Sequence, residues 1–428
     1  MSLAYLDLND STLRLQHDDR LVESPGYAVY DGRGYTFGSE ARGRARLRPR
    51  DIATRFWWQL DTRPLQPSLG PARHSADLVH QHLQQLHAAA DAPDDLLLAA
   101  PGSMQDAQLS LLLGIIQQCP FRAVGLVHRS VAVASLFQVD GPLFHLELQL
   151  HQALLTELRA GEGVVRLQRE TVLPGCGLLQ LQERLVETLA RAFIRQTRFD
   201  PRRRAESEQQ LYDALHTLLH DLRAQPEALL EIQGHRVRIG RVELADCSAA
   251  LRDSVSGQLA AHRDAPLLMD PLVALLPGLG EAWRSLQLDP ADLFTALAAQ
   301  QARLLQEEDA LVFVSELPLL GERGLETSGE KTDREPASDS AAPDTTSSPP
   351  LPTHLLRGHK ARPLADGEVL LAGWQLRRSK QGWQLQQQPG SSPLQLNGRA
   401  ARDGDTLRCG DYLQADDGEP SQLIAVGE

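Results

Sequence analysis

The segment DDLLLAAPGSMQDAQLSLLLGIIQQCPFRAVGLVHRSVAVASL, residues 94–136, decides the fold class. It opens with an apolar run over 94–101, which predicts a buried strand. A helical pattern over 106–119, a second strand over 121–128 and a second helix over 130–137 follow. Strands that alternate with helices are typical of a sheet built from parallel strands. The segment therefore predicts an α/β architecture.

The same alternation continues on both sides of this segment. Further strands and helices are predicted for LAYLDL (3–8), SADLVHQHLQQLHAAA (75–90), LQERLVETLARAFIRQTRF (181–199) and the hairpin ALLEIQGHRVRIGRVEL (228–244). The second of these has Leu78, Val79, Leu83 and Leu86 at the spacing of one helix face. We therefore expect the α/β pattern to extend over most of the chain.

Length and composition limit the classes of protein. A chain of 428 residues predicts two or three domains. The net charge of −13 argues against a nucleic-acid partner, which needs a concentrated basic surface. No apolar run approaches ~20 residues, so we expect no membrane span. Four scattered cysteines and an N-terminus without signal-peptide features favour the cytoplasm.

A change of composition divides the chain near residue 320. Residues 321–352 are rich in Ser, Thr, Pro and acidic side chains, which predicts a disordered linker. Residues 353–428 contain short, half-alternating apolar segments separated by turn residues. We predict that this last part is a small all-β sandwich.

The order of the segments over residues 3–305 resembles the nucleotide-binding domain of seventy-kilodalton heat-shock chaperones. Residues 94–136 are similar to the family's strand that ends in proline and to the helix, strand and helix that follow it. The resemblance implies a two-lobed actin-like ATPase fold over 1–320. Its lobes would cover about 1–140 and 141–320, with a helical insertion over about 181–262.

The family's phosphate-binding motifs are altered in this chain. Its first loop, D-L-G-T-T, becomes Asp7-Leu8-Asn9-Asp10-Ser11, so the glycine is lost and Asp10 adds a charge where a phosphate would lie. Its second loop, D-L-G-G-G-T, aligns with HLELQLH (145–151), and no glycine occurs between Gly141 and Gly161. Glycine matters in both loops because it lets backbone N–H groups approach phosphate closely.

The charged groups that such an ATPase uses are also altered. The family's N-E-P-T becomes His128-Arg129-Ser130-Val131, so a cation replaces the acidic residue. The three lysines are Lys331, Lys360 and Lys380, and the family's phosphate-contacting lysine therefore has no counterpart. Because such groups stabilise transition-state charge, their loss predicts an inactive cleft.

We therefore expect a vestigial nucleotide cleft with no catalytic residue, metal or cofactor. Its residues would be Asp7, Asn9, Asp10, Ser11, Arg129, His145 and Glu147. Taken alone, Asp7 is either a strand-end carboxylate that caps a turn or a remaining metal ligand. The alternative is a divergent ATPase that binds ATP and Mg²⁺ through Asp7, Glu147 and an arginine.

The strand proposed for HLELQLH could also carry a metal-binding site. Residues 145, 147, 149 and 151 would share one face of a strand, and His, Glu and His can ligate a metal there. Because no fourth ligand is evident, we favour a polar wall of the cleft.

The C-terminal segment GWQLQQQPGSSPLQLNGRAARDGDTLRCGDYLQ, residues 382–414, resembles the end of a forkhead-associated domain. The matches are Trp383, Leu385, Ser391, Asn397-Gly398, Leu407 and Gly410-Asp411. That family binds phosphothreonine through Arg and Ser, and Arg377, Arg378 and Ser379 lie near the corresponding loop. The family's pattern is broken there, which leaves two alternatives, a degenerate scaffold and a phosphopeptide reader.

The leading functional hypothesis is a catalytically inactive scaffold or adaptor that binds a protein partner of unknown identity. A tethered β module would raise its avidity for such a partner. The alternatives are the divergent chaperone-like ATPase and a phosphopeptide-binding adaptor.

Overall fold

Residues 94–136 form two neighbouring parallel strands, each followed by a helix. These elements are β9 (Asp95–Ala100), α3 (Asp106–Ile116), β10 (Arg122–His128) and α4 (Arg129–Ala134). All six residues of β9 are buried, as expected for a parallel strand that is covered on both faces. The predicted α/β architecture is confirmed.

The computed structural model describes most of the chain, which divides into two units, Met1–Thr332 and Asp333–Glu428. The described residues are 2–279, 283–306, 311–321, 323–324, 352–357, 360–364, 366, 373–379, 382–389, 391–396, 399–407, 411–415 and 421–424. Most of the linker predicted for 321–352 lies outside them, and its predicted disorder stays a prediction.

The first unit contains two six-stranded sheets. The first sheet has the order β19-β10-β9-β1-β2-β3, with β1 (Leu3–Asp7), β2 (Leu13–His17), β3 (Arg20–Ser24) and β19 (Phe313–Val314). Strands β1, β2 and β3 are antiparallel neighbours, whereas β9 is parallel to β1 and β10 is parallel to β9. We call residues 2–140, which supply five of these strands, the first lobe.

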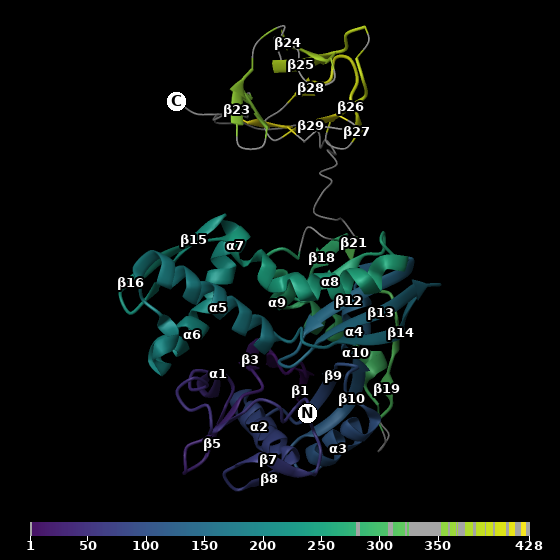
Figure 1. Ribbon diagram of the computed structural model, residues 1–428. Helices are drawn as coiled ribbons and strands as arrows, with labels where there is room; N and C mark the ends of the chain where they lie inside the picture. The colour runs from purple at the N-terminus through teal and green to yellow at the C-terminus, as the bar shows by residue number, and fades with distance from the viewer. Residues whose placement is uncertain are drawn as a thin grey trace, which may run out of the picture. The chain divides into compact units, whose positions relative to one another are not determined.

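The second sheet repeats this arrangement. Its order is β18-β17-β12-β13-β14-β20, with β12 (Gly141–Leu148), β13 (Ala153–Gly161), β14 (Val164–Leu173), β17 (Leu267–Met269), β18 (Ser285–Gln287) and β20 (Glu316–Pro318). Three antiparallel strands are again followed by two strands parallel to the first. We call residues 141–304 the second lobe; Figure 1 shows it above the first.

Helices and small hairpins surround the two sheets (Figure 1). In the first lobe they are β4 (Ala28–Tyr30), β5 (Tyr35–Phe37), α1 (Gly38–Arg42), β6 (Ile52–Ala53), β7 (Pro64–Leu69), β8 (Ala72–His74), α2 (Ser75–Ala89) and β11 (Phe137–Gln138). The predicted face of α2 is confirmed, because Leu78, Val79, Leu83 and Leu86 are buried. An amphipathic helix is stable when this stripe packs on a core.

The second lobe carries a largely helical insertion between β14 and β17. Its elements are α5 (Leu178–Thr197), α6 (Ala205–Ala224), the hairpin β15 (Glu227–Ile232) and β16 (His235–Gly240), α7 (Arg241–Ala245) and α8 (Ala249–Gln258). Leu181, Leu185 and Leu189 of α5 are buried at intervals of four residues. The predicted long helix and the predicted hairpin are both confirmed.

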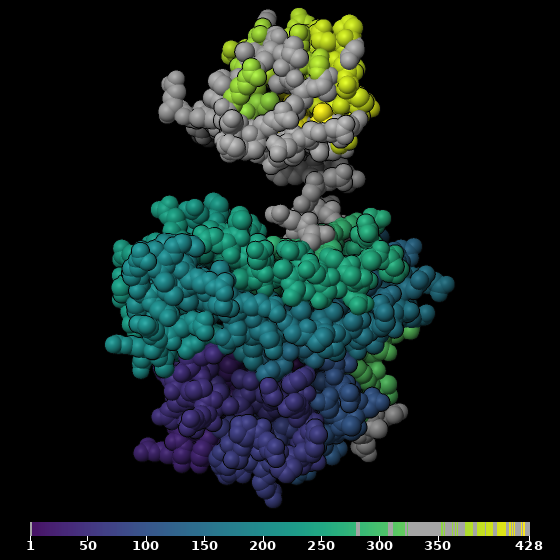
Figure 2. All heavy atoms as spheres, viewed as in Figure 1, coloured from purple at the N-terminus to yellow at the C-terminus, as the bar shows by residue number. Residues whose placement is uncertain are grey.

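An apolar core joins the two lobes. It contains Leu97 of β9, Leu268 of β17 and the fully buried helix α4, together with residues of α10 (Asp292–Leu304). After α10, the segment that contains β19 and β20 pairs with both sheets. Strand β19 lies beside β10 in the first sheet, and β20 lies beside β14 in the second. On the face shown in Figure 2, atoms of the two lobes meet along a broad boundary.

The second unit is built from strands, as predicted. A six-stranded sheet contains β22 (His354–Arg357), β23 (Lys360–Pro363), β26 (Leu394–Leu396), β27 (Arg399–Ala400), β29 (Tyr412–Ala415) and β30 (Ser421–Ile424). A three-stranded sheet contains β24 (Gln375–Ser379), β25 (Gly382–Gln386) and β28 (Thr406–Leu407). Trp374, Leu385 and Leu413 belong to one apolar core drawn from both sheets.

In the part of the chain that the structure describes, no helix combines the length and apolar character needed to cross a membrane.

Candidate functional site

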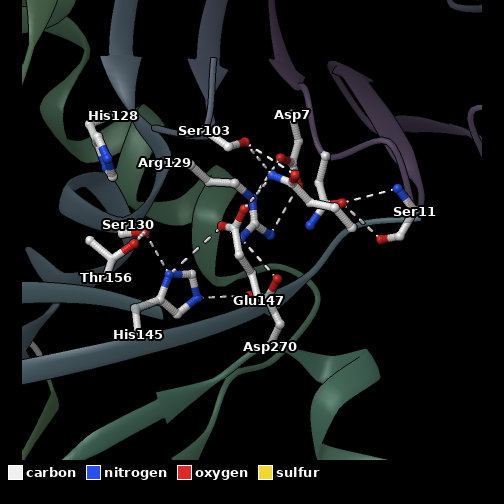
Figure 3. A network of polar contacts seen from close by, with 12 residues as sticks. Asp7, Ser11, Ser103, His128, Arg129, Ser130, His145, Glu147, Thr156 and Asp270 are labelled. Carbon is white, nitrogen blue, oxygen red and sulfur yellow. Dashed lines mark hydrogen bonds and ion pairs between the residues drawn. The ribbon is translucent and has the colours of Figure 1, made fainter. Parts of the chain in front are cut away.

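The candidate site lies where strand ends of the two lobes meet. Asp7 is the last residue of β1, and Glu147 is the last but one of β12. Arg129 directly follows β10, and Asp270 directly follows β17. Because parallel strands end at the same edge of a sheet, each lobe brings two of these side chains to one edge. Figure 3 shows all four pointing toward one another.

Arg129 is the centre of this ion network. Its Nε donates to Asp7 Oδ1 at 2.8 Å, and its Nη1 donates to Glu147 Oε2 at 2.9 Å. The same Nη1 lies 2.8 Å from Asp270 Oδ2. All four side chains are buried. A buried charge is stable only when it is paired and hydrogen-bonded, so the guanidinium and the three carboxylates hold one another in place.

A second arginine neutralises part of the acidic charge. Arg14 of β2 donates through Nη2 to Asp7 Oδ2 at 2.8 Å and through Nη1 to the carbonyl oxygen of Pro290. Asp7 therefore contacts two guanidinium groups, and its Oδ2 accepts hydrogen bonds from both. Pro290 belongs to the second lobe, so Arg14 also joins the lobes.

The carboxyl groups of the second lobe differ in their proton affinity. Burial raises the pKa of Glu147, and the positive charge of Arg129 offsets this shift only in part. Burial also works to raise the pKa of Asp270, but the charge of Arg129 and the hydrogen bond from His145 hold that pKa well below its usual range. Asp270 is thus the more firmly ionised of the two partners of Arg129 Nη1.

His145 extends the network behind these carboxylates. Its Nε2–H donates to Asp270 Oδ1 at 3.0 Å, and its Nδ1 lies 2.8 Å from Ser130 Oγ. Ser130 Oγ in turn lies 3.1 Å from Thr156 Oγ1. Both ring nitrogens therefore have partners, and the imidazole is held in one orientation (Figure 3).

The first turn, between β1 and β2, is held by its own side chains. Asn9 Oδ1 accepts hydrogen bonds from the backbone N–H of Ser11 at 3.0 Å and from Ser11 Oγ at 2.9 Å. Asn9 thus stabilises the turn where the resembling family has glycine. Such a bond from an Asn side chain to the backbone two residues on is a common turn device.

A hydrogen bond joins this turn of the first lobe to the turn of the second lobe between β12 and β13. Asp10 Oδ1 accepts from the backbone N–H of Leu150 at 2.8 Å. Asp10 is buried, and burial raises its pKa to about 7 despite the lowering effect of that hydrogen bond. The Asp10 carboxyl therefore occupies the backbone donor of Leu150.

Other contacts close the same region. Gln149 Nε2 donates to Ser103 Oγ at 2.9 Å, and Trp58 Nε1 donates to Gln152 Oε1 at 3.0 Å. The rings of Trp58 and His151 stack with centroids 5.1 Å apart. Every one of these pairs joins the first lobe to the second.

The β12–β13 turn is also fixed from behind by α5. The backbone N–H groups of Leu178 and Leu179 donate to the carbonyl oxygens of Gln149 and Leu150 at 2.9 and 3.0 Å. The first N–H groups of a helix have no partner within the helix. Here the turn satisfies two of them, and Gly177 provides the close approach.

A cavity of about 530 Å³ remains open beside the ion network. The first lobe lines it with polar residues, and the second lobe contributes both polar and apolar residues. The lining includes Asn9, Ser11, Thr12, Arg14, Arg129, His216, His220, Arg223, Leu272, Leu275, Leu288 and Asp289. The site is therefore filled at the ion network and open on one side of it.

The seven predicted cleft residues do lie close together. Asp7, Arg129, His145 and Glu147 share the ion network, and Asn9, Asp10 and Ser11 form the adjoining turn. The predicted strand face over 145–151 is wrong at its end, because β12 stops at Leu148 and the chain turns. His151 therefore leaves that face and stacks on Trp58.

Sequence reasoning missed two members of the network, Asp270 and Arg14. Asp270 follows a strand, as Asp7 ends one, and this shared position was a usable signal. Arg14 lies in mid-strand, and we find no pattern in the sequence that distinguishes it from the many other arginines.

The predicted phosphopeptide residues of the second unit lie on one strand, β24, where Arg377 and Ser379 share a face. Arg377 and Arg378 are consecutive in β24, so their side chains leave opposite faces of the sheet. The Arg378 guanidinium lies 5.8 Å from the centroid of the Trp383 ring, and Ser379 is paired with Gly382. The predicted motif residues Asn397, Gly398 and Gly410 lie outside the described residues. Phosphopeptide binding stays a prediction.

No protein-family model matches this chain, and no curated protein matches it. The site is therefore interpreted from its own geometry.

Proposed function

We propose that residues 1–320 form a two-lobed fold of the actin and heat-shock-chaperone ATPase type that does not hydrolyse ATP. The repeated strand order of the two sheets supports the fold, and so does the helical insertion between β14 and β17. The chain would then act as a scaffold or adaptor through contacts with a protein partner.

The hydrogen bond between Asp10 and Leu150 carries this proposal. In the ATPases that the sequence resembles, the two turns hold phosphates between them. Here the turns contact each other directly at 2.8 Å through the side chain of Asp10. Ordered contacts from Gln149 and Gln152 to the first lobe further reduce the space.

The open cavity favours a second candidate, which is nucleotide binding without hydrolysis. Polar groups of Asn9 and Thr12 line it together with the apolar side chains of Leu272 and Leu275. A cavity of about 530 Å³ is in the range that small-molecule sites occupy. A nucleotide bound there would need its phosphates outside the closed turns.

Calorimetry on the full chain with ATP and with ADP, each with and without Mg²⁺, distinguishes the two candidates. We expect no heat of binding at nucleotide concentrations up to about 1 mM, where a site with a Kd of that size would be half filled. Stoichiometric binding at micromolar concentration would contradict the closed cleft.

A cavity variant identifies the site if nucleotide does bind. Leu275→Trp places a larger side chain in the wall of the cavity and should abolish the binding. Leu229→Trp is the matched control, because Leu229 is 64% exposed on β15, a strand that contributes no residue to the cavity lining. Binding that survives in Leu275→Trp would place the nucleotide elsewhere.

A further inference from the structure

The Arg129 guanidinium lies beside three side chains that could ligate a metal ion. His145, Glu147 and Asp270 each offer one ligand atom, and these atoms all lie within 4.8 Å of one another. Arg129 Nη1 is 2.9 Å from the oxygen of Glu147 and 2.8 Å from that of Asp270. The cation that balances these carboxylates is therefore part of the protein chain.

We propose that Arg129 fills a latent divalent-metal site formed by His145, Glu147 and Asp270. The wild-type protein would accordingly have no need of a metal there, and a small side chain at position 129 would open the site to Mn²⁺ or Zn²⁺. This inference adds to the proposed function, because it concerns the cation of the cleft and makes no assumption about nucleotide.

The three ligands are buried, and one of them is already held in a fixed orientation. All three side chains are buried, and two of them are carboxylates that must be neutralised when Arg129 is removed. His145 is already oriented through Nδ1, 2.8 Å from Ser130 Oγ. Metal-binding histidines are usually oriented in this way by a partner of the other ring nitrogen.

Metal binding through His145 Nε2 requires a balanced proton shift. The proton that Nε2 now donates to Asp270 would move to Nδ1, where Ser130 Oγ would accept it. The imidazole stays neutral, Nε2 gains a free lone pair, and Asp270 no longer accepts a hydrogen bond from Nε2. Imidazole together with carboxylates suits Mn²⁺ and Zn²⁺.

The test is a Mn²⁺ titration of the full-length wild type and of Arg129→Ala, with free Mn²⁺ followed by electron paramagnetic resonance. We expect one ion per chain in Arg129→Ala and an affinity at least about 100-fold weaker in the wild type. Replacing one ligand in the same background, as in Arg129→Ala with Glu147→Gln, should weaken binding at least about 10-fold. Arg129→Lys is the matched control, because it keeps a cation in the site.

Thermal unfolding provides a second readout for the same proteins. Mn²⁺ at about 100 times its Kd should raise the Tm of Arg129→Ala by roughly 5–10 °C, whereas the Tm of the wild type should not change. If Arg129→Ala fails to fold without metal, the double variant Arg129→Ala with Asp7→Asn removes one uncompensated carboxylate and keeps the three ligands.

A folded variant that binds no more Mn²⁺ than the wild type overturns the proposal. So does stoichiometric Mn²⁺ binding by the wild type, because Arg129 would then not fill the site. The proposal is also overturned if Mn²⁺ raises the Tm neither of Arg129→Ala nor of the double variant Arg129→Ala with Asp7→Asn. None of these results depends on ATP, so the proposed function and this inference can fail separately.

Discussion

At the scale of single residues, two side chains act as internal ligands of the cleft. Arg129 provides a cation among Asp7, Glu147 and Asp270, and the Asp10 carboxyl accepts a backbone N–H of the opposite turn. Neither contact needs any molecule from outside the chain. These contacts hold the two lobes together through groups of the chain itself.

Asp10 should make the stability of the protein depend on pH. Burial raises its pKa from 3.8 to about 7, so between these values the folded state keeps a proton that the unfolded state has lost. The free energy of unfolding contributed by Asp10 therefore falls as pH rises from about 4 to about 7 and is constant above that range. Asp10→Asn keeps an oxygen for Leu150 and does not titrate.

We expect Asp10→Asn to gain stability relative to the wild type, by on the order of 2–4 kcal/mol, between pH 4.5 and pH 7.5. Denaturant unfolding at both values measures this difference. A constant difference between the two proteins would show that Asp10 is ionised in the folded protein across the whole range.

At the scale of elements, the β12–β13 turn depends on the start of α5. The first N–H groups of α5 donate to Gln149 and Leu150, and Gly177 lies against the backbone of His151 and Gln152. A methyl group at position 177 would collide with that backbone. The turn therefore keeps its shape through packing with a helix that begins about 30 residues later in the chain.

Gly177→Ala should destabilise the protein, by about 1–3 kcal/mol, because the turn must move away from α5. Gly114→Ala is the matched control: Gly114 is inside α3, and its added methyl group would have no atom within 4 Å. We expect that control to be neutral or more stable by about 0.5–1 kcal/mol. Equal Tm values for the two variants would mean that the turn adapts without cost.

At the scale of the whole first unit, the two lobes should unfold together. Leu97 belongs to the sheet of the first lobe and Leu268 to that of the second, and both are fully buried in the same apolar core. The pairing of β19 and β20 with the two sheets adds backbone hydrogen bonds from one short segment to both lobes. Such a shared core is expected to unfold in one cooperative step.

Leu97→Ala and Leu268→Ala should therefore lower the Tm of the same calorimetric transition, each at a cost of about 2–5 kcal/mol. Leu229→Ala, at a side chain that is 64% exposed, should change the stability by less than about 0.5 kcal/mol. Two separate transitions, each shifted by one variant, would show that the lobes are independent.

The amino-acid sequence by itself determined the elements and the location of the site. Three elements could be predicted from local patterns, because the periodicity of apolar residues indicates them directly. They are the apolar run 95–100, the helix face with Leu78, Val79, Leu83 and Leu86, and the hairpin after α6. The loss of glycine at Asn9 and the cation at Arg129 could likewise be seen in the sequence.

Only the tertiary structure decided what these residues do. Asp7, Arg129, Glu147 and Asp270 are separated by up to 263 positions, and their contact depends on the packing of two sheets. The turn at Gln149 replaced the predicted end of a strand, because α5 and the first lobe both hydrogen-bond to it. Local patterns carry no information about such long-range contacts, so the sequence could point to a cleft but could not show that the protein fills it with its own charges.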